Sequence, residues 1–109
     1  MTELSKYTSF RVGGPAQKIV QVSTEAEIIA AIEEAGDSPV LIMGGGTNVL
    51  IADKGFDGTV IRISNNSVQS EVDACSGATL TIGAGEDWDT FVQTTIDRGY
   101  AGLETLSGI

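Results

Sequence analysis

The stretch that most constrains the fold is a short apolar run that leads directly into three consecutive glycines. Residues 40–43 are all apolar, and Gly44, Gly45 and Gly46 follow without an intervening residue. A short apolar run bounded by turn residues predicts a buried strand of a parallel sheet, covered on both faces. Residues without a Cβ allow positive φ and close approach to the backbone. Successive N–H groups in such a turn can form a concave site for an anion such as phosphate.

The preceding segment predicts a parallel βαβ unit. Residues 18–22 are short and rich in β-branched side chains, which is typical of a strand. Thr24 and Glu27 match a capping box at the start of a helix, and Gly36 ends it. Its apolar residues share one helical face: Ile28, Ile29, Ile32 and Ala35. The glycine turn then follows the second strand of the unit, at the edge where ligands of parallel sheets collect.

After the turn, residues 49–52 are apolar again, so we expect the turn to lie between two strands. A polar turn at residues 53–58 leads to a third predicted strand at residues 59–63. Residues 64–67 are polar and predict a loop, which indicates a boundary between two lobes. We therefore expect a first lobe at residues 1–64 and a second at residues 65–109.

The second lobe has a different period. Apolar and polar residues alternate over 68–74 and 78–84, which predicts a half-exposed antiparallel hairpin turned at residues 75–77. Asp87 is the predicted N-cap of a following helix and Gly99 its stop. The apolar face of that helix contains Trp88, Phe91, Val92, Thr95 and Ile96. This spacing favours a packing role for Trp88 over stacking on a ligand.

The N-terminal residues give weaker signals. We expect Met1–Ser5 to be a loose lead-in. The following segment, residues 7–16, contains Gly13-Gly14-Pro15 and predicts a shaped loop. We favour a packing loop anchored by Phe10 over a second loop that approaches a ligand. Because the sequence stops within an apolar, glycine-containing segment, we also expect it to be a piece of a longer chain.

Charge and composition narrow the possible functions. The formal net charge is −9, with six lysines and arginines in 109 residues. No stripe of them is visible in the sequence, which argues against a nucleic-acid or anionic-membrane partner. Since the cations look few and scattered, we expect backbone amides to hold any phosphate. One cysteine and no histidine exclude a disulfide framework and a Cys/His metal site. The absence of a leader pattern favours a cytoplasmic protein.

Neither standard phosphate loop fits the glycine turn. A Walker A loop needs Lys after its last glycine, and a dinucleotide fingerprint needs glycine where Val49 stands. Thr47 and Asn48 nevertheless offer a hydroxyl and an amide beside the glycines. Each glycine costs conformational entropy on folding. A simple tight turn that needs one glycine should therefore not contain three. We therefore favour a ligand-binding turn over a purely structural one.

Five motifs, in this order and spacing, resemble the UDP-N-acetylenolpyruvoylglucosamine reductase (MurB) family. They are residues 7–14, 40–51, 55–61, 83–88 and 102–109. The resemblance implies an α+β fold, an FAD-binding domain of the vanillyl-alcohol-oxidase (PCMH) type. A small parallel βαβ lobe would be followed by an antiparallel-strand lobe that is truncated here.

The resemblance also implies a cofactor site. The turn would wrap the FAD pyrophosphate, with Ser107, Gly108 and Ile109 near the flavin. The residues on the pyrophosphate would be Gly44, Gly45, Gly46, Thr47, Asn48, Val49 and Leu50. NADPH would be the co-substrate and a UDP-sugar the substrate. The family's catalytic serine, arginine and glutamate would lie downstream, so we expect no catalytic or metal-binding residue here. Alone, this piece is expected to be inactive and to bind FAD weakly at most.

Two other functions remain open at this point. One is a piece of another FAD-linked sugar or alcohol oxidase. The absence of histidine and the place of Cys75 in a hairpin turn disfavour the covalent flavin common in such enzymes. The other is a non-catalytic module whose glycine turn is only structural.

Overall fold

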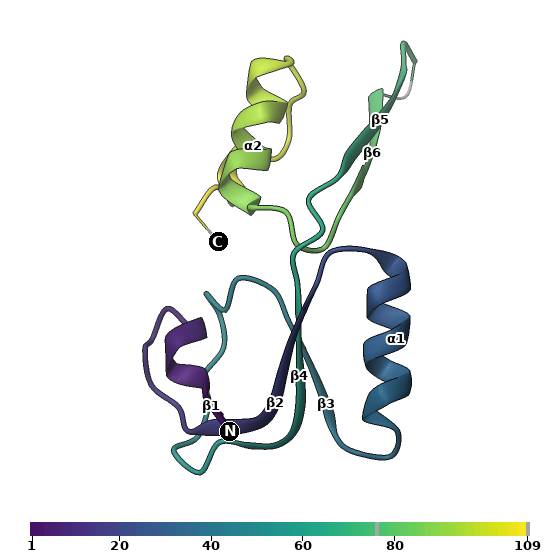
Figure 1. The fold of residues 1–109 in the computed structure, drawn as a ribbon. Coiled ribbons are helices and arrows are strands. Elements are labelled where there is room, and N and C mark those ends of the chain that lie inside the picture. Colours follow the sequence, from purple (N-terminus) through teal and green to yellow (C-terminus); the bar gives the residue numbers. More distant parts are fainter. Residues whose placement is uncertain (76, 109) are drawn as a thin grey trace.

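The structure, a computed structural model, describes residues 1–75 and 77–108. Its larger sheet has four strands in the order β1-β2-β4-β3 (Figure 1). These are β1 (Thr2–Glu3), β2 (Pro15–Val22), β4 (Phe56–Ile63) and β3 (Val40–Met43). β1 is antiparallel to β2, whereas β2 and β3 are both parallel to β4. The helix α1 (Glu25–Ala35) connects β2 to β3, so the predicted βαβ unit is confirmed, with β4 between its two strands.

The rest of the chain forms a second sheet and a second helix. β5 (Val68–Asp73) and β6 (Gly77–Ile82) pair as an antiparallel hairpin, and α2 (Trp88–Asp97) follows. Figure 1 shows these elements at one end of the molecule and the four-stranded sheet with α1 at the other. The predicted α+β class is confirmed. Within the described residues, neither helix is long and apolar enough to cross a membrane.

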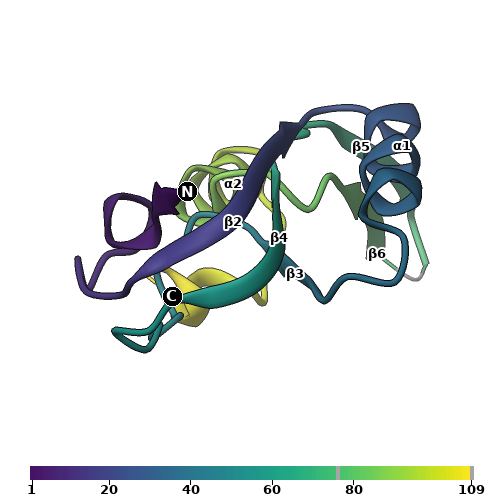
Figure 2. The same ribbon diagram turned by 60° about the horizontal axis from the view of Figure 1, so that its bottom comes forward.

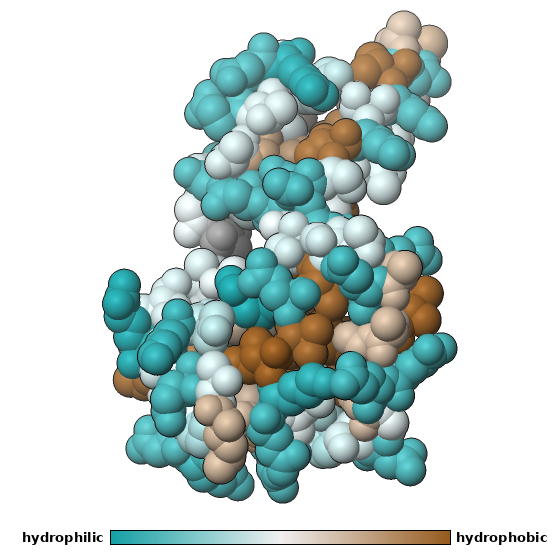
Figure 3. Space-filling view, in the orientation of Figure 1, coloured by the Kyte–Doolittle hydropathy of each residue, from teal (hydrophilic) through white to brown (hydrophobic). Residues whose placement is uncertain are grey.

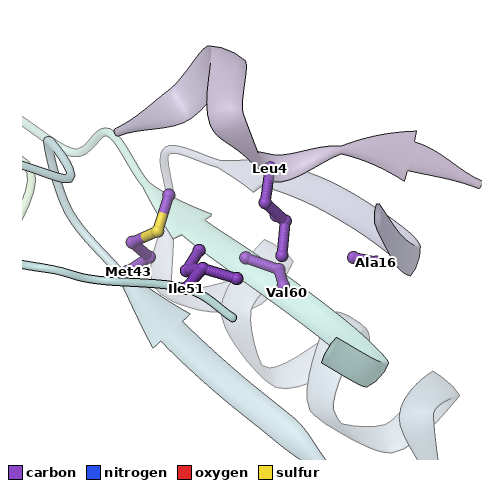
Figure 4. Packing of buried hydrophobic residues seen from close by; sticks show 5 residues of the cluster. All are labelled: Leu4, Ala16, Met43, Ile51 and Val60. Carbon is purple, nitrogen blue, oxygen red and sulfur yellow. The ribbon is translucent and has the colours of Figure 1, made fainter. Parts of the chain in front are cut away.

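Each face of the four-stranded sheet has its own core. On one face, five buried side chains form one cluster (Figure 4): Leu4, Ala16, Met43, Ile51 and Val60. On the other face, α1 packs through Ala31 against Val22 and Ile61. Alternation along β4 sends Val60 to the first core and Ile61 to the second. β4 is therefore the buried centre of the sheet.

The predicted burial of the strand at residues 40–43 is wrong. β3 is an edge strand, and Ile42 in it is 54% exposed. A continuous apolar run cannot reveal which strand of a sheet is central. In α1, Ile29 and Ile32 stay exposed because the helix contacts the sheet through Ala31 and Ile28. Figure 3 shows apolar side chains reaching the surface over this half of the molecule.

The predicted boundaries also change near the N-terminus and before β4. Met1–Ser5 is not a loose lead-in, since β1 pairs with β2 and Leu4 is fully buried. Leu4 begins a short 3₁₀ helix, Leu4–Tyr7. β2 starts at Pro15 and β4 at Phe56, each three residues earlier than predicted. Figure 2 shows the long, twisted β2 and β4 side by side, as their parallel register requires.

The hairpin and the second helix largely follow prediction. In the hairpin register, Val68 faces Ile82 and Val72 faces Ala78, so the apolar residues share one face. Asp87 caps α2 by accepting a hydrogen bond from the Thr90 N–H, at 2.8 Å. The buried residues of α2 are Phe91, Val92 and Thr95, whereas Ile96 is 43% exposed. A short 3₁₀ turn, Glu104–Leu106, follows.

Glu27 ties the start of α1 to the end of β2. Thr24 Oγ1 accepts from the Glu27 N–H at 3.2 Å, and Glu27 Oε2 accepts from the Ser23 N–H at 2.7 Å. The Ser23 backbone N–H is the main cause that lowers the pKa of Glu27 from its ordinary value. A lowered folded-state pKa stabilises the fold above the unfolded-state pKa, and that stabilisation is lost as pH falls through the folded value.

We therefore expect Glu27→Gln to destabilise the chain at neutral pH, with the difference from wild type shrinking in acid. Urea denaturation at about pH 7 and about pH 3 measures this difference. Glu25→Gln is the control, because it removes a carboxylate of the same helical turn that makes no such hydrogen bond. A difference that does not depend on pH would contradict the expectation.

Candidate functional site

The glycine turn leaves the carboxyl end of β3 and begins an irregular crossing of the sheet. Residues 44–55 contain no strand, so the prediction of a turn between two strands is wrong. Instead, the segment lies over the first core, with Ile51 buried and Leu50 76% exposed. It is held by the Gly13-Gly14 turn, where the Gly14 N–H donates to the Ala52 carbonyl at 2.9 Å. A Cβ on Gly14 would overlap the Asp53 carbonyl oxygen, which explains that glycine.

The three glycines of the turn have different roles. Gly46 has φ +75°, and a Cβ there would overlap the Tyr7 carbonyl oxygen. A Cβ on Gly44 would make an ordinary contact, 3.8 Å from the Ala84 carbonyl oxygen. Gly45 has neither positive φ nor any atom within 4 Å of such a Cβ. The fold therefore requires glycine at position 46, whereas the open space at position 45 is available to another molecule.

The backbone N–H groups of the turn are free to act as donors. Among hydrogen bonds between described residues, none has its donor in the backbone of residues 45–50. Thr47 and Asn48 are exposed, so their side chains are also accessible. An oxyanion could therefore accept hydrogen bonds here from backbone and side chain alike.

The N-terminal loop lies directly beside this turn. The Ser9 N–H donates to the Gly46 carbonyl at 2.9 Å. The Tyr7 carbonyl group also lies against Gly46. Phe10 is 57% exposed, so it does not anchor the loop as predicted. Leu4 and Tyr7 do so instead, through the first core. The loop therefore lies next to the glycine turn, and its approach to a ligand, the less favoured alternative, stays a prediction.

Three of the six cations gather at this junction. Lys6, Arg11 and Arg62 line a hollow of about 380 Å³ together with Gly45 and residues 7–9. The expectation that the cations are scattered is therefore wrong. Arg62 reaches the site because it stands opposite Met43 in the parallel register of β3 and β4, at the point where the glycine turn begins. No sequence signal connects it to Lys6 and Arg11, because the three come together only through folding.

The other predicted site residues lie away from the hollow or already make contacts within the chain. Ser107 Oγ donates to the Asp89 carboxylate, and the Gly108 N–H donates to the same oxygen at 3.0 Å. These bonds fix the C-terminal segment against the start of α2. Ile109, the remaining predicted residue near the flavin, is outside the described residues. Val49 is half-buried against the first core.

A second, larger cavity of about 600 Å³ lies between the hairpin and α2. Its lining is mainly apolar and includes Trp88, Leu80 and Ile82. The Trp88 ring packs on Phe91, with centroids 5.3 Å apart, and its Nε1–H donates to the Leu106 carbonyl at 3.0 Å. These contacts fit the predicted packing role of Trp88. We place the anion site at the smaller hollow because it combines cations with the glycine turn.

Comparison with known proteins gives the family. A family model described as "FAD binding domain" matches residues 16–109. The UDP-N-acetylenolpyruvoylglucosamine reductases of Cutibacterium acnes and Streptomyces coelicolor are 43% and 44% identical over 108 residues, which is 97% of this chain. The chain spans 29% and 27% of these relatives, respectively.

A solved structure is also similar. It is titled as the UDP-N-acetylenolpyruvylglucosamine reductase (MurB) from Thermus caldophilus. The TM-score is 0.70 at 30% identity, covering 97% of this chain and 36% of the other. The open space at Gly45, the free N–H groups and the adjacent cations suit the diphosphate of a dinucleotide. The resemblance inferred from the sequence is thus confirmed: the chain belongs to the family of FAD binding domains, and FAD is its cofactor.

Proposed function

We propose that this chain is the FAD-binding part of an NADPH-dependent reductase. The proposed reaction reduces the enolpyruvyl group of UDP-N-acetylglucosamine enolpyruvate to give UDP-N-acetylmuramate, a step of peptidoglycan synthesis. Support comes from relatives named UDP-N-acetylenolpyruvoylglucosamine reductase that match 97% of this chain. The substrates, a nucleotide sugar and NADPH, favour a cytoplasmic location.

The structural observation that carries the proposal is the open space at Gly45. A glycine with neither positive φ nor a crowded Cβ position has no role inside the fold, yet glycine has an entropic cost there. That cost is explained if a ligand approaches the backbone at this point. In the proposed site, the N–H groups of residues 45–50 donate to the FAD diphosphate, and Thr47 and Asn48 add side-chain hydrogen bonds.

The chemistry of the proposed reaction is divided between this chain and residues outside it. Bound FAD supplies the hydride carrier that the reduction of a carbon–carbon double bond needs. This chain's part is to bind and orient that cofactor, and we assign no catalytic residue within it. We further propose that residues 1–64 and 65–109 are two lobes of the domain, since each has its own sheet.

Replacing Gly45 with leucine tests the cofactor site. We expect the variant to fold with wild-type stability, within about 0.5 kcal/mol, because its side chain enters open space. FAD binding should weaken about tenfold or more, because the side chain occupies the approach to the backbone N–H groups. Quenching of flavin fluorescence during titration measures this affinity.

Ala26→Leu is the matched control, since it adds a similar volume at an exposed position of α1. The control should leave FAD binding unchanged. If Gly45→Leu binds FAD as wild type does, the glycine turn is only structural and the proposed cofactor site is wrong.

A further inference from the structure

The cations beside the glycine turn have no acidic partners. Among the described residues, the ion pair formed is Lys18–Glu34, which lies elsewhere, and no carboxylate lines the hollow that contains Lys6, Arg11 and Arg62. The chain carries 15 acidic residues against six basic ones. Three cations gathered without a carboxylate are therefore unexpected in so acidic a chain. Like charges placed together repel, so the cluster is stabilised only when an anion joins it.

Arg62 is held in a way that leaves its charge unbalanced. Its guanidinium lies 5.0 Å from the centre of the Tyr7 ring, and its Nη1 donates only a long hydrogen bond, 3.4 Å, to Gln21. Its Nε is buried and has no partner among the described residues. Taking a guanidinium partly out of water is costly unless its N–H groups are paired. The ring and the strand thus orient Arg62 without neutralising it.

Arg11 occupies a backbone conformation that suits glycine better. Its φ is +56°, the left-handed region, and it is the one described residue other than glycine with positive φ. Such a conformation costs about 1 kcal/mol or more for a residue with a Cβ. Strain of this kind is often found where a side chain is needed for binding. Here the strained backbone holds the cationic side chain of Arg11 in the lining of the hollow.

Thr8 adds a second sign of a missing partner. It lines the same hollow and is 6% exposed, and its Oγ1 has no hydrogen-bond partner among the described residues. Buried hydroxyls are normally satisfied. Cations, a hydroxyl and free backbone N–H groups are all donors, and donors in one hollow suit a ligand rich in acceptor oxygens.

We propose that Lys6, Arg11 and Arg62 form a diphosphate-binding wall that completes the site of the glycine turn. This inference rests on the proposed function, because it assigns the same cofactor's diphosphate to further residues. It also replaces a site made of backbone amides alone with one that depends on charge. Binding should therefore weaken as salt screens the cations.

The test titrates wild-type protein and charge variants with FAD, inorganic pyrophosphate and riboflavin, which lacks the diphosphate. Lys6→Gln, Arg62→Gln and Arg11→Gly each remove one cation from the hollow. Arg98→Gln removes an exposed cation beyond α2 and is the control. Arg62→Lys keeps the charge in case Arg62→Gln perturbs the sheet. Circular dichroism and thermal melting report folding independently of binding.

We expect each charge-removing variant to bind FAD and pyrophosphate about tenfold or more weakly, as loss of a charge-assisted hydrogen bond predicts. Riboflavin binding and the Arg98→Gln variant should not change, and Arg62→Lys should recover part of the affinity. Arg11→Gly should melt at the same or a higher temperature while it binds less. Opposite effects on stability and binding would not arise from a purely structural Arg11.

Other results would overturn either the cation wall or the proposed function. If all variants bind FAD as wild type does, with the same salt dependence, the cation wall is wrong and the proposed FAD site stands. If pyrophosphate binds and the variants weaken it, but FAD neither binds nor competes even at concentrations high enough to detect weak binding, the anion site stands and the proposed function fails. If pyrophosphate neither binds nor displaces FAD, the wall is not a diphosphate site.

Discussion

Gly46→Ala is expected to destabilise the chain by about 3 to 5 kcal/mol, near the upper end for a single substitution. The added Cβ would overlap the Tyr7 carbonyl oxygen, and it would lie 3.1 Å from the carbonyl carbon and 3.2 Å from the Thr8 Cα. All of these are backbone atoms, which cannot rotate away. The φ of +75° adds the ordinary cost of a left-handed conformation for alanine. Urea denaturation followed by circular dichroism measures the loss.

Gly45→Ala is the matched control for this substitution. It adds the same methyl group one residue earlier in the same turn, where no atom lies within 4 Å. Its stability should equal or slightly exceed that of wild type, because alanine restricts the unfolded chain. Equal effects of the two substitutions would mean that the N-terminal loop does not pack against the turn as described.

Leu4→Ala is expected to cost about 2 to 5 kcal/mol, the usual range for a fully buried leucine. Leu4 is 0% exposed and belongs to the same buried cluster as Ala16 and Val60, on one face of the sheet. Its N–H also donates to the Gly14 carbonyl at 3.1 Å, which joins the N-terminus to the Gly-Gly-Pro turn. Since Lys6 to Arg11 follow Leu4 directly, loss of this anchor should also weaken FAD binding.

Val12→Ala is the control, because Val12 is 45% exposed in the same N-terminal region. We expect it to change the free energy of unfolding by less than about 0.5 kcal/mol. Should Leu4→Ala prove as mild as Val12→Ala, the N-terminal residues are not part of the core.

Local signals allowed much of the fold to be predicted. The bounds of α1 follow from Thr24, Glu27 and Gly36, and the cap of α2 follows from Asp87, because capping depends on residues close in sequence. The N-terminal pairing was missed because a two-residue strand and a single buried leucine carry no period. The sequence does not show that β4 is central, because strand order depends on long-range pairing, which a hydrophobic pattern does not report.

The same distinction applies to the site. The glycine turn was recognisable because its three glycines are adjacent, and their composition alone indicates close approach. The sequence gives no sign of the cation cluster, because Lys6 and Arg62 are far apart in it. They meet only when the N-terminal loop packs on Gly46 and β4 inserts between β2 and β3. The sequence thus predicts the backbone part of the proposed site, whereas the cations beside it become visible only in the structure.

The pairing of Met43 with Arg62 links the electrostatics of the site to the strand register of β4. Side chains alternate along a strand, so a slip of one residue would turn Arg62 toward α1 and bring an isoleucine, Ile61 or Ile63, to the glycine turn. The same slip would turn Val60 toward α1 and put Thr59 or Ile61 in its place in the first core. The hydrophobic pattern that selects the native register therefore also selects the face on which this positive charge appears.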